Sequence, residues 1–175
     1  MNSLSRTPYG PAVSHSDNGW LIILLSFIAA WVLTIVPLPA WAQVYRPEWV
    51  ALVLIYWCLN EPRRIGIAAG WGAGLLLDVL TDSLLGQHAL ALVLVAFLAL
   101  KLNRQMHTTL VWQQALTVLF LIAAEQMLVL WIKGITGHPP WSLTYFLPSL
   151  TSMLLWPAVY AILRALLRGS NDHSR

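Results

Sequence analysis

The sequence predicts an all-α membrane protein in which six transmembrane helices form a compact bundle. Of its 175 residues 58% are hydrophobic and only 10% are charged, whereas a soluble domain carries roughly 25% charged residues. The apolar residues fall into six runs separated by short segments rich in glycine, proline or charge. We expect one integral membrane domain at 20–168, a disordered cytoplasmic tail at 1–19 and a short cytoplasmic tail at 169–175, because both tails are polar and lack an apolar period.

The first two runs differ in length. Residues 20–41 are long enough to cross a bilayer, which takes about 20 apolar residues, and Pro37 and Pro39 should kink or end this helix. Residues 49–60 would rise only about 18 Å, against about 30 Å of hydrocarbon. From its length alone, this second run either crosses as a short helix or re-enters on the same side.

Polar or glycine-containing breaks separate the other four runs. In the sixth run, Pro148 and Pro157 are expected to kink the helix. The third to sixth runs comprise residues 65–85, 88–102, 112–135 and 143–167, with a tight turn at 61–64, a break at 86–88, a polar loop at 101–109 and a turn at 134–141.

The basic residues predict the orientation. If all six runs cross and the amino terminus is cytoplasmic, eight of the ten Lys and Arg residues lie on the cytoplasmic side and only Arg46 and Lys133 lie outside. This bias agrees with the positive-inside rule. Making residues 49–60 re-entrant would place most of the basic residues outside, so we expect this short run to cross and both termini to be cytoplasmic.

The third run carries a regular stripe of small and acidic residues. Gly66, Gly70 and Gly74 recur every four residues, and Asp78 and Asp82 continue the spacing, so all five share one face of a helix. Such a stripe lets another helix approach closely in a membrane. For Asp78 two interpretations stay open: an interhelical hydrogen bond or ion pair that fixes the bundle or a partner, and a carboxylate solvated near the outer interface. For Asp82 we favour the solvated alternative.

A second acidic residue lies deep in an apolar run. Glu125 is near the middle of residues 112–135, and Gln126 follows it. A carboxyl group at such a depth is costly and usually marks a packing contact or a polar path. The candidate residues for helix packing or partner binding are therefore Gly66, Gly70, Gly74, Asp78 and Glu125.

Several classes of function find no support in the sequence. The basic residues are scattered and form no run that could follow a phosphate backbone, so we expect no nucleic-acid binding. Cys58 is the single cysteine, and the histidines have no set of partners at metal-ligand spacing. Ser83 and Ser149 lack a base within helical reach. We therefore expect no enzyme, no catalytic residues, no metal and no cofactor.

Longer segments of the chain resemble a known family. The segments RPEWVALVLIYWCLNEPRRIGI, GLLLDVLTDSLLGQHALAL, WQQAL and WPAVYAILR are similar to the MreD family of bacterial rod shape-determining proteins. The strongest features are Arg46-Pro47, the arginine-containing turn after the second run, Gly74 to Asp78, and Gly86-Gln87-His88. The resemblance extends from about Leu24 to Arg168 and brings no catalytic residues with it.

The resemblance implies a multi-pass protein of the bacterial inner membrane that belongs to the cell-elongation machinery. The implied partners are MreC and, through it, MreB, RodA and a penicillin-binding transpeptidase, together with membrane lipid; a homo-oligomer stays open. MreD-like chains are also similar in fold to the six-helix substrate-binding subunits of energy-coupling-factor transporters, which gives the alternative of a small-molecule-binding membrane subunit. The short external segments offer few converging polar groups for a small molecule and favour the scaffold.

Overall fold

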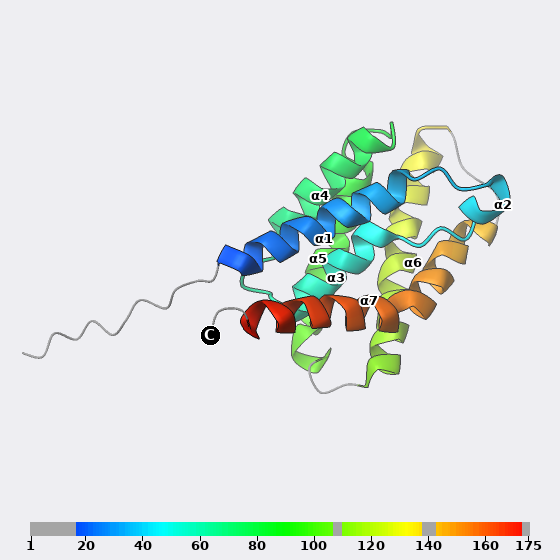
Figure 1. Cartoon of the computed structure of the whole chain (residues 1–175). Helices are drawn as coiled ribbons and strands as arrows, with labels where there is room; N and C mark the ends of the chain where they lie inside the picture. The colour runs from blue at the N-terminus through cyan, green and yellow to red at the C-terminus, as the bar shows by residue number, and fades with distance from the viewer. Residues whose placement is uncertain (1–16, 107–109, 138–142, 173–175) are drawn as a thin grey trace, which may run out of the picture.

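The computed structural model describes residues 17–106, 110–137 and 143–172, and these residues form an all-helical bundle (Figure 1). Six of the helices have 12 or more residues and follow the six predicted apolar runs. The elements in chain order are α1 (Asp17–Ile35), α2 (Ala40–Gln43), α3 (Trp49–Asn60), α4 (Ile67–Leu80), α5 (Gln87–Met106), α6 (Val111–Ile135), the 3-10 helix η1 (Leu143–Phe146) and α7 (Leu147–Asp172).

The short helix α3 forms the centre of the bundle. Every residue from Val50 to Leu59 is buried, and α3 contacts α1, α4, α5, α6 and α7. A helix that is apolar on all sides is stable only when other elements surround it. The indole Nε1 of Trp57 donates a hydrogen bond to Ser26 Oγ of α1 at 2.8 Å, so the polar atom of this large side chain is satisfied. All of α3 except its first and last residue is thus enclosed by protein.

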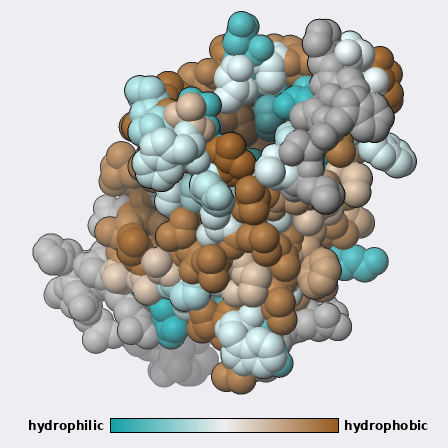
Figure 2. Space-filling model, turned by 90° about the vertical axis from the view of Figure 1, so that its right-hand side faces the viewer, coloured by the Kyte–Doolittle hydropathy of each residue, from teal (hydrophilic) through white to brown (hydrophobic). Residues whose placement is uncertain are grey.

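The outer helices expose apolar side chains. Two segments, Val111–Ile135 and Thr144–Leu167, are long and apolar enough to cross a membrane, and four shorter apolar helices accompany them. Leu24, Phe120 and Leu154 are among the large side chains that lie more than half exposed. Figure 2 shows one face of the molecule, where apolar side chains cover much of the middle, while hydrophilic ones gather toward the top and lie singly near the right and lower edges. This surface suits a lipid environment.

Several predicted boundaries are accurate. Helix α3 has the predicted bounds, α1 ends two residues before Pro37, and α6 begins one residue before the predicted run. Pro157 lies inside the continuous helix α7, whose direction changes along its length in Figure 1. Pro148 lies in the first turn of α7, where a missing N–H costs little. Residues 138–141 of the predicted turn at 134–141 lie outside the described residues.

Other predicted boundaries are wrong. Helix α5 continues to Met106, so the predicted loop at 101–109 is helical over its first six residues; residues 107–109 lie outside the described ranges. Asn103 gives a reason, because its Nδ2 donates to the carbonyl oxygens of Cys58 and Leu59 at the end of α3, at 3.0 and 2.5 Å. The last turns of α5 therefore cap the central helix.

Three further segments differ from expectation. Helix α4 ends at Leu80, five residues before the end of the predicted run. Helix α1 begins at Asp17 and α7 extends to Asp172, so both predicted tails are helical where they adjoin the bundle. Residues 1–16 and 173–175 lie outside the part of the chain that the structure describes.

Candidate functional site

The carboxylate of Asp78 caps the start of helix α5. Asp78 is completely buried, and its oxygens accept hydrogen bonds from the backbone N–H groups of Gly86 and His88, both at 2.8 Å. The Ser83 hydroxyl donates a further hydrogen bond at 2.9 Å. Because the first N–H groups of a helix have no partner within the helix, a carboxylate at this position satisfies them and interacts favourably with the helix dipole.

The turn between α4 and α5 wraps around this carboxylate. The N–H of Ser83 donates to the backbone oxygen of Asp78 at 3.0 Å, which ends α4 early. Asp82 has a φ of 51° and Gly86 a φ of 98°, both in the left-handed region that aspartate tolerates and glycine favours. Asp82 is exposed, which agrees with its predicted solvation.

Two of the three predicted glycines lie in the interface between α4 and α5. A Cβ atom at Gly74 would stand 2.4 Å from Ala89 Cα, and one at Gly70 would stand 2.8 Å from the Leu92 carbonyl oxygen. These glycines therefore permit backbone contact between two helices of the same chain. A Cβ at Gly66 would meet no atom within 4 Å, so this residue lies outside the interface.

His88 connects Asp78 to a second acidic group. Its Nδ1 lies 2.8 Å from an Asp78 carboxylate oxygen. Since an ionised carboxylate can only accept, His88 Nδ1 carries the proton in this contact. His88 also attracts the Glu48 carboxylate electrostatically, so the imidazole lies between the α4–α5 turn and the start of α3.

Glu48 joins four elements at one end of the bundle. It directly precedes α3, and its backbone N–H donates to Ser152 Oγ of α7 at 3.0 Å. Its carboxyl group is hydrogen-bonded by the Gln126 side chain of α6 and interacts electrostatically with Glu125, the preceding residue of α6. We call Glu48, Asp78, His88, Glu125 and Gln126 the polar cluster.

Two cations act on the Glu48 side of the polar cluster. The Arg46 guanidinium donates to the carbonyl oxygens of Thr34 and Val36 at the end of α1, and Lys133 Nζ lies 5.5 Å from the centre of the Tyr145 ring. Burial raises the pKa of the Glu48 carboxyl group, while His88, the Gln126 hydrogen bond, Lys133 and Arg46 act in the opposite direction. The pKa of Glu48 is therefore raised by burial, and these four groups limit the rise.

Some buried polar atoms near this cluster lack a hydrogen-bond partner. They are Glu125 Oε2, Gln126 Oε1 and Gln87 Nε2, in residues that are 2%, 3% and 4% exposed. Native proteins leave few such atoms unsatisfied, and each one calls for an explanation. Asp78 is saturated with donors, whereas Glu125 is not.

Two acidic residues of the polar cluster were predicted from the sequence, and a third was not. Asp78 and Glu125 were expected from their depth, but the role of Glu48 and the proximity of Glu48 to Glu125 were not. The sequence did point to these residues, because they lie in the segments that carry the family resemblance. Glu48 directly follows Arg46-Pro47, and Gln87 and His88 directly follow Gly86. In the part of the chain that the structure describes, no group of three or more His, Cys, Asp or Glu residues is placed to hold a metal ion.

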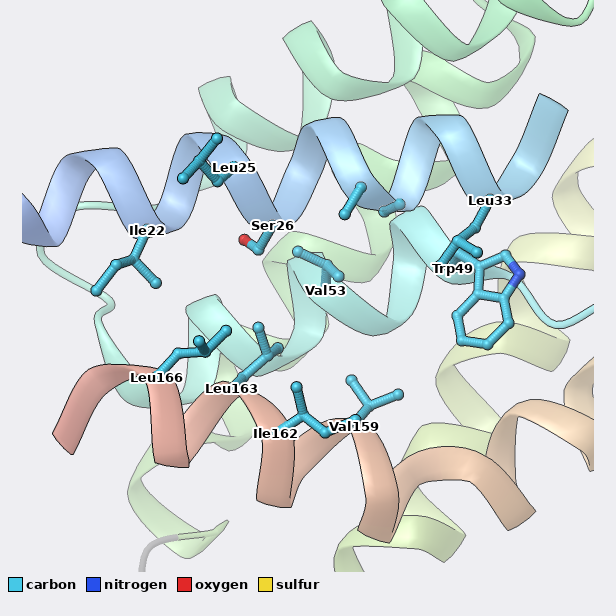
Figure 3. A pocket seen from close by; sticks show the side chains of 12 residues that line it. Ile22, Leu25, Ser26, Leu33, Trp49, Val53, Val159, Ile162, Leu163 and Leu166 are labelled. Carbon is cyan, nitrogen blue, oxygen red and sulfur yellow. The ribbon is translucent and has the colours of Figure 1, made fainter. Parts of the chain in front are cut away.

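An apolar groove lies between α1 and α7, with α3 at its floor (Figure 3). Its volume is about 390 Å³. In Figure 3 Leu25 comes from α1, Val53 from α3 and Ile162 from α7, and the red atom is the hydroxyl oxygen of Ser26. The Ser26 hydroxyl is already bonded to Trp57 Nε1 and to the Ile23 carbonyl oxygen. The groove therefore offers shape and apolar contact but little polar recognition.

Two comparisons with known proteins point to the same family. The family profile described as rod shape-determining protein MreD matches residues 14–166. The rod shape-determining protein MreD of Haemophilus influenzae is 30% identical over 154 residues, which cover 88% of this chain and 95% of that protein. No solved structure matches this chain significantly, so the similarity to energy-coupling-factor subunits stays an expectation.

Proposed function

The chain belongs to the MreD family of rod shape-determining proteins, and we propose that it is a non-catalytic component of the cell-elongation machinery in the bacterial inner membrane. It supports rod shape and lateral peptidoglycan synthesis through contacts with other membrane proteins. Its partners are MreC and, through MreC, the actin-like MreB, RodA and a penicillin-binding transpeptidase.

The observation that supports this proposal most strongly is the family match over nearly the whole helical bundle. The arrangement of the polar groups agrees with a scaffold. Asp78, Gly70 and Gly74 act within the α4–α5 interface, so they hold the bundle together and leave the outer helix faces to lipid and partner helices. The large exposed apolar side chains of α1 and α7 supply such faces.

We further propose that all six long helices cross the membrane and that both termini are cytoplasmic. The eight-to-two distribution of basic residues supports this orientation. In Figure 1 the start of α1 and the end of α7 lie on the same side of the bundle, as six crossings require. The polar cluster then lies toward the outer side, where Arg46 and Lys133 are also expected.

The alternative of a small-molecule-binding transporter subunit gains no support from the groove between α1 and α7, because its lining is almost entirely apolar. Complementation and co-purification test the proposal together. A depleted strain that carries the tagged wild-type chain is expected to remain rod-shaped, and elongation proteins should co-purify from its membranes. Rounding despite normal protein levels, or co-purification of an ATPase pair with a coupling subunit, would contradict the proposal. The tagged homologue from Haemophilus influenzae serves as the positive control.

A further inference from the structure

The polar cluster contains two carboxyl groups that come from different elements and interact. Glu125 lies in the middle of α6 and is 2% exposed, and Glu48, at the start of α3, acts on it electrostatically. Glu125 Oε2 has no hydrogen-bond partner. Two ionised carboxylates that interact while one of them is buried repel each other, and the buried one also loses hydration, so it is favoured to bind a proton.

The surrounding charges indicate which carboxyl group is ionised. Glu48 is stabilised as an anion by His88 of α5, Lys133 of α6, Arg46 of the preceding loop and the Gln126 hydrogen bond. For Glu125, the charged group that acts among the described residues is Glu48 itself, which disfavours its ionisation. The charge pattern therefore favours the anion on Glu48 over the anion on Glu125.

Among the described residues, the elements that pack against α6 supply no positive charge that acts on Glu125. From η1, Tyr145 presents a neutral phenol to both carboxyl groups. From α7, the Ser152 hydroxyl accepts the Glu48 backbone N–H. At the α4–α5 turn, outside the contacts of α6, the Asp78 carboxylate is occupied by the first N–H groups of α5 and by His88.

The amide oxygen of Gln126 is a buried acceptor without a hydrogen-bond donor, which is an observation independent of the charges. Gln126 is 3% exposed, and its side chain forms a hydrogen bond with Glu48. Because only the amide nitrogen can donate to a carboxylate, Nε2 faces Glu48. The amide oxygen, Oε1, has no hydrogen-bond partner. A protonated Glu125 supplies a hydroxyl donor in this region, where the other acidic and amide oxygens can only accept.

We propose that Glu125 and Glu48 form a proton-binding site in which Glu125 carries a proton at neutral pH and links α6 to the start of α3. When the proton leaves, both carboxyl groups are anionic and α6 is pushed away from this junction. The site makes the packing of this end of the bundle sensitive to pH. It is a property of the polar cluster and does not depend on the proposed partners.

Infrared spectroscopy of the full chain in detergent micelles tests the site directly, since a protonated carboxyl group has a C=O stretching band that a carboxylate lacks. At neutral pH we expect this band in the wild type, shifted by exchange into D₂O, and its loss in Glu125→Gln. In Glu48→Gln the band should remain, because Glu125 is still buried. No band in the wild type, or the same band in Glu125→Gln, would overturn the proposal.

A thermal unfolding series gives a second readout. A proton held more tightly in the folded state stabilises fully at acid pH, and this stability is lost as the pH rises and the proton is released. The unfolding temperature of the wild type should therefore fall by a few degrees as the pH is raised, and Glu125→Gln should flatten this dependence. An unchanged dependence in Glu125→Gln would contradict the proposal.

A metal cation is the competing occupant, because carboxylate and amide oxygens also bind hard cations. Replacing sodium chloride by choline chloride at constant ionic strength should leave the infrared band and the unfolding temperature unchanged. If sodium alone removed the band or raised the unfolding temperature of the wild type but not that of Glu125→Gln, the site would hold a metal cation and not a proton, and the proposal would be wrong.

Discussion

Asp78 and Glu125 are both carboxyl groups buried in apolar helices, yet their surroundings are opposite. Asp78 accepts hydrogen bonds from the backbone N–H groups of Gly86 and His88 and from the Ser83 hydroxyl. Glu125 has an oxygen without a partner and a second carboxyl group as its charged neighbour. The role of a buried carboxyl group is thus decided by the donors around it and not by its depth.

The bundle therefore contains one buried carboxyl group whose charge is stabilised and one whose charge is not. Around Asp78 the charge is needed, because the Ser83 hydroxyl, the His88 ring and the N–H groups at the start of α5 all donate hydrogen bonds to the carboxylate. Around Glu125 a charge would be a cost, since one oxygen has no hydrogen-bond partner and the charged group that acts on it is another carboxylate. A neutral amide in place of the carboxyl group should therefore destabilise the protein at Asp78 and change its stability little at Glu125.

The largest effect is expected when the acceptor at the start of α5 is removed. Asp78→Leu leaves buried N–H groups and the Ser83 hydroxyl without a partner, and breaking a buried charged interaction in this way costs about 3 to 5 kcal/mol. We expect little folded protein in membranes and rounded cells in a complementation assay. A wild-type level of Asp78→Leu in membranes, measured by immunoblotting, would show that the cap is dispensable and would remove the contrast with Glu125.

A smaller effect is expected where α4 and α5 approach most closely. Gly74→Ala places a Cβ 2.4 Å from Ala89 Cα, and overpacking of this kind costs about 1 to 3 kcal/mol. The matched control is Gly72→Ala in the same helix, where a Cβ meets no atom within 4 Å and alanine is the better helix former. Denaturant unfolding in detergent should show a loss for Gly74→Ala only; equal stability of both variants would mean that the helices can separate at no cost.

The smallest effect is expected for a single donor to Asp78. Ser83→Ala removes the hydroxyl that lies 2.9 Å from the carboxylate, and such a bond contributes about 0.5 to 1.5 kcal/mol. Thr117→Ala is a suitable control, because in the described part of the chain the Thr117 hydroxyl donates to the Gln113 carbonyl oxygen of its own helix at 3.1 Å and to no other element. We expect the midpoint of unfolding to fall for Ser83→Ala and to stay within error for Thr117→Ala. The reverse order would show that the Asp78 carboxylate does not depend on Ser83.

The sequence predicted the helical elements well because apolar periodicity and turn residues are local signals. The bounds of α3 and the end of α1 before Pro37 follow from such signals. The early end of α4 could not be predicted from local signals, because the turn that follows it is built around the Asp78 carboxylate, which accepts hydrogen bonds from residues up to eleven positions later. The extension of α5 likewise depends on the contact of Asn103 with α3.

For the candidate site, the sequence identified buried carboxyl groups but not their partners. Asp78 and Glu125 are each the acidic residue deep in its own apolar run, which is visible without a structure. The proximity of Glu48 to Glu125 joins residues 77 positions apart, and no local pattern encodes it. The glycine stripe was visible too, but only the structure shows that Gly70 and Gly74 face α5 of the same chain.

A comparison of Asp78→Asn with Glu125→Gln by unfolding in detergent at neutral pH tests the central claim most directly. Asparagine turns an NH₂ group toward donors that need an acceptor, so Asp78→Asn should be destabilised by about 1 to 3 kcal/mol. Glutamine replaces a carboxyl group that is already neutral, so Glu125→Gln should stay within about 0.5 kcal/mol of the wild type. If Glu125→Gln lost as much stability as Asp78→Asn, the charge on Glu125 would be required, and the distinction between the two sites would be wrong.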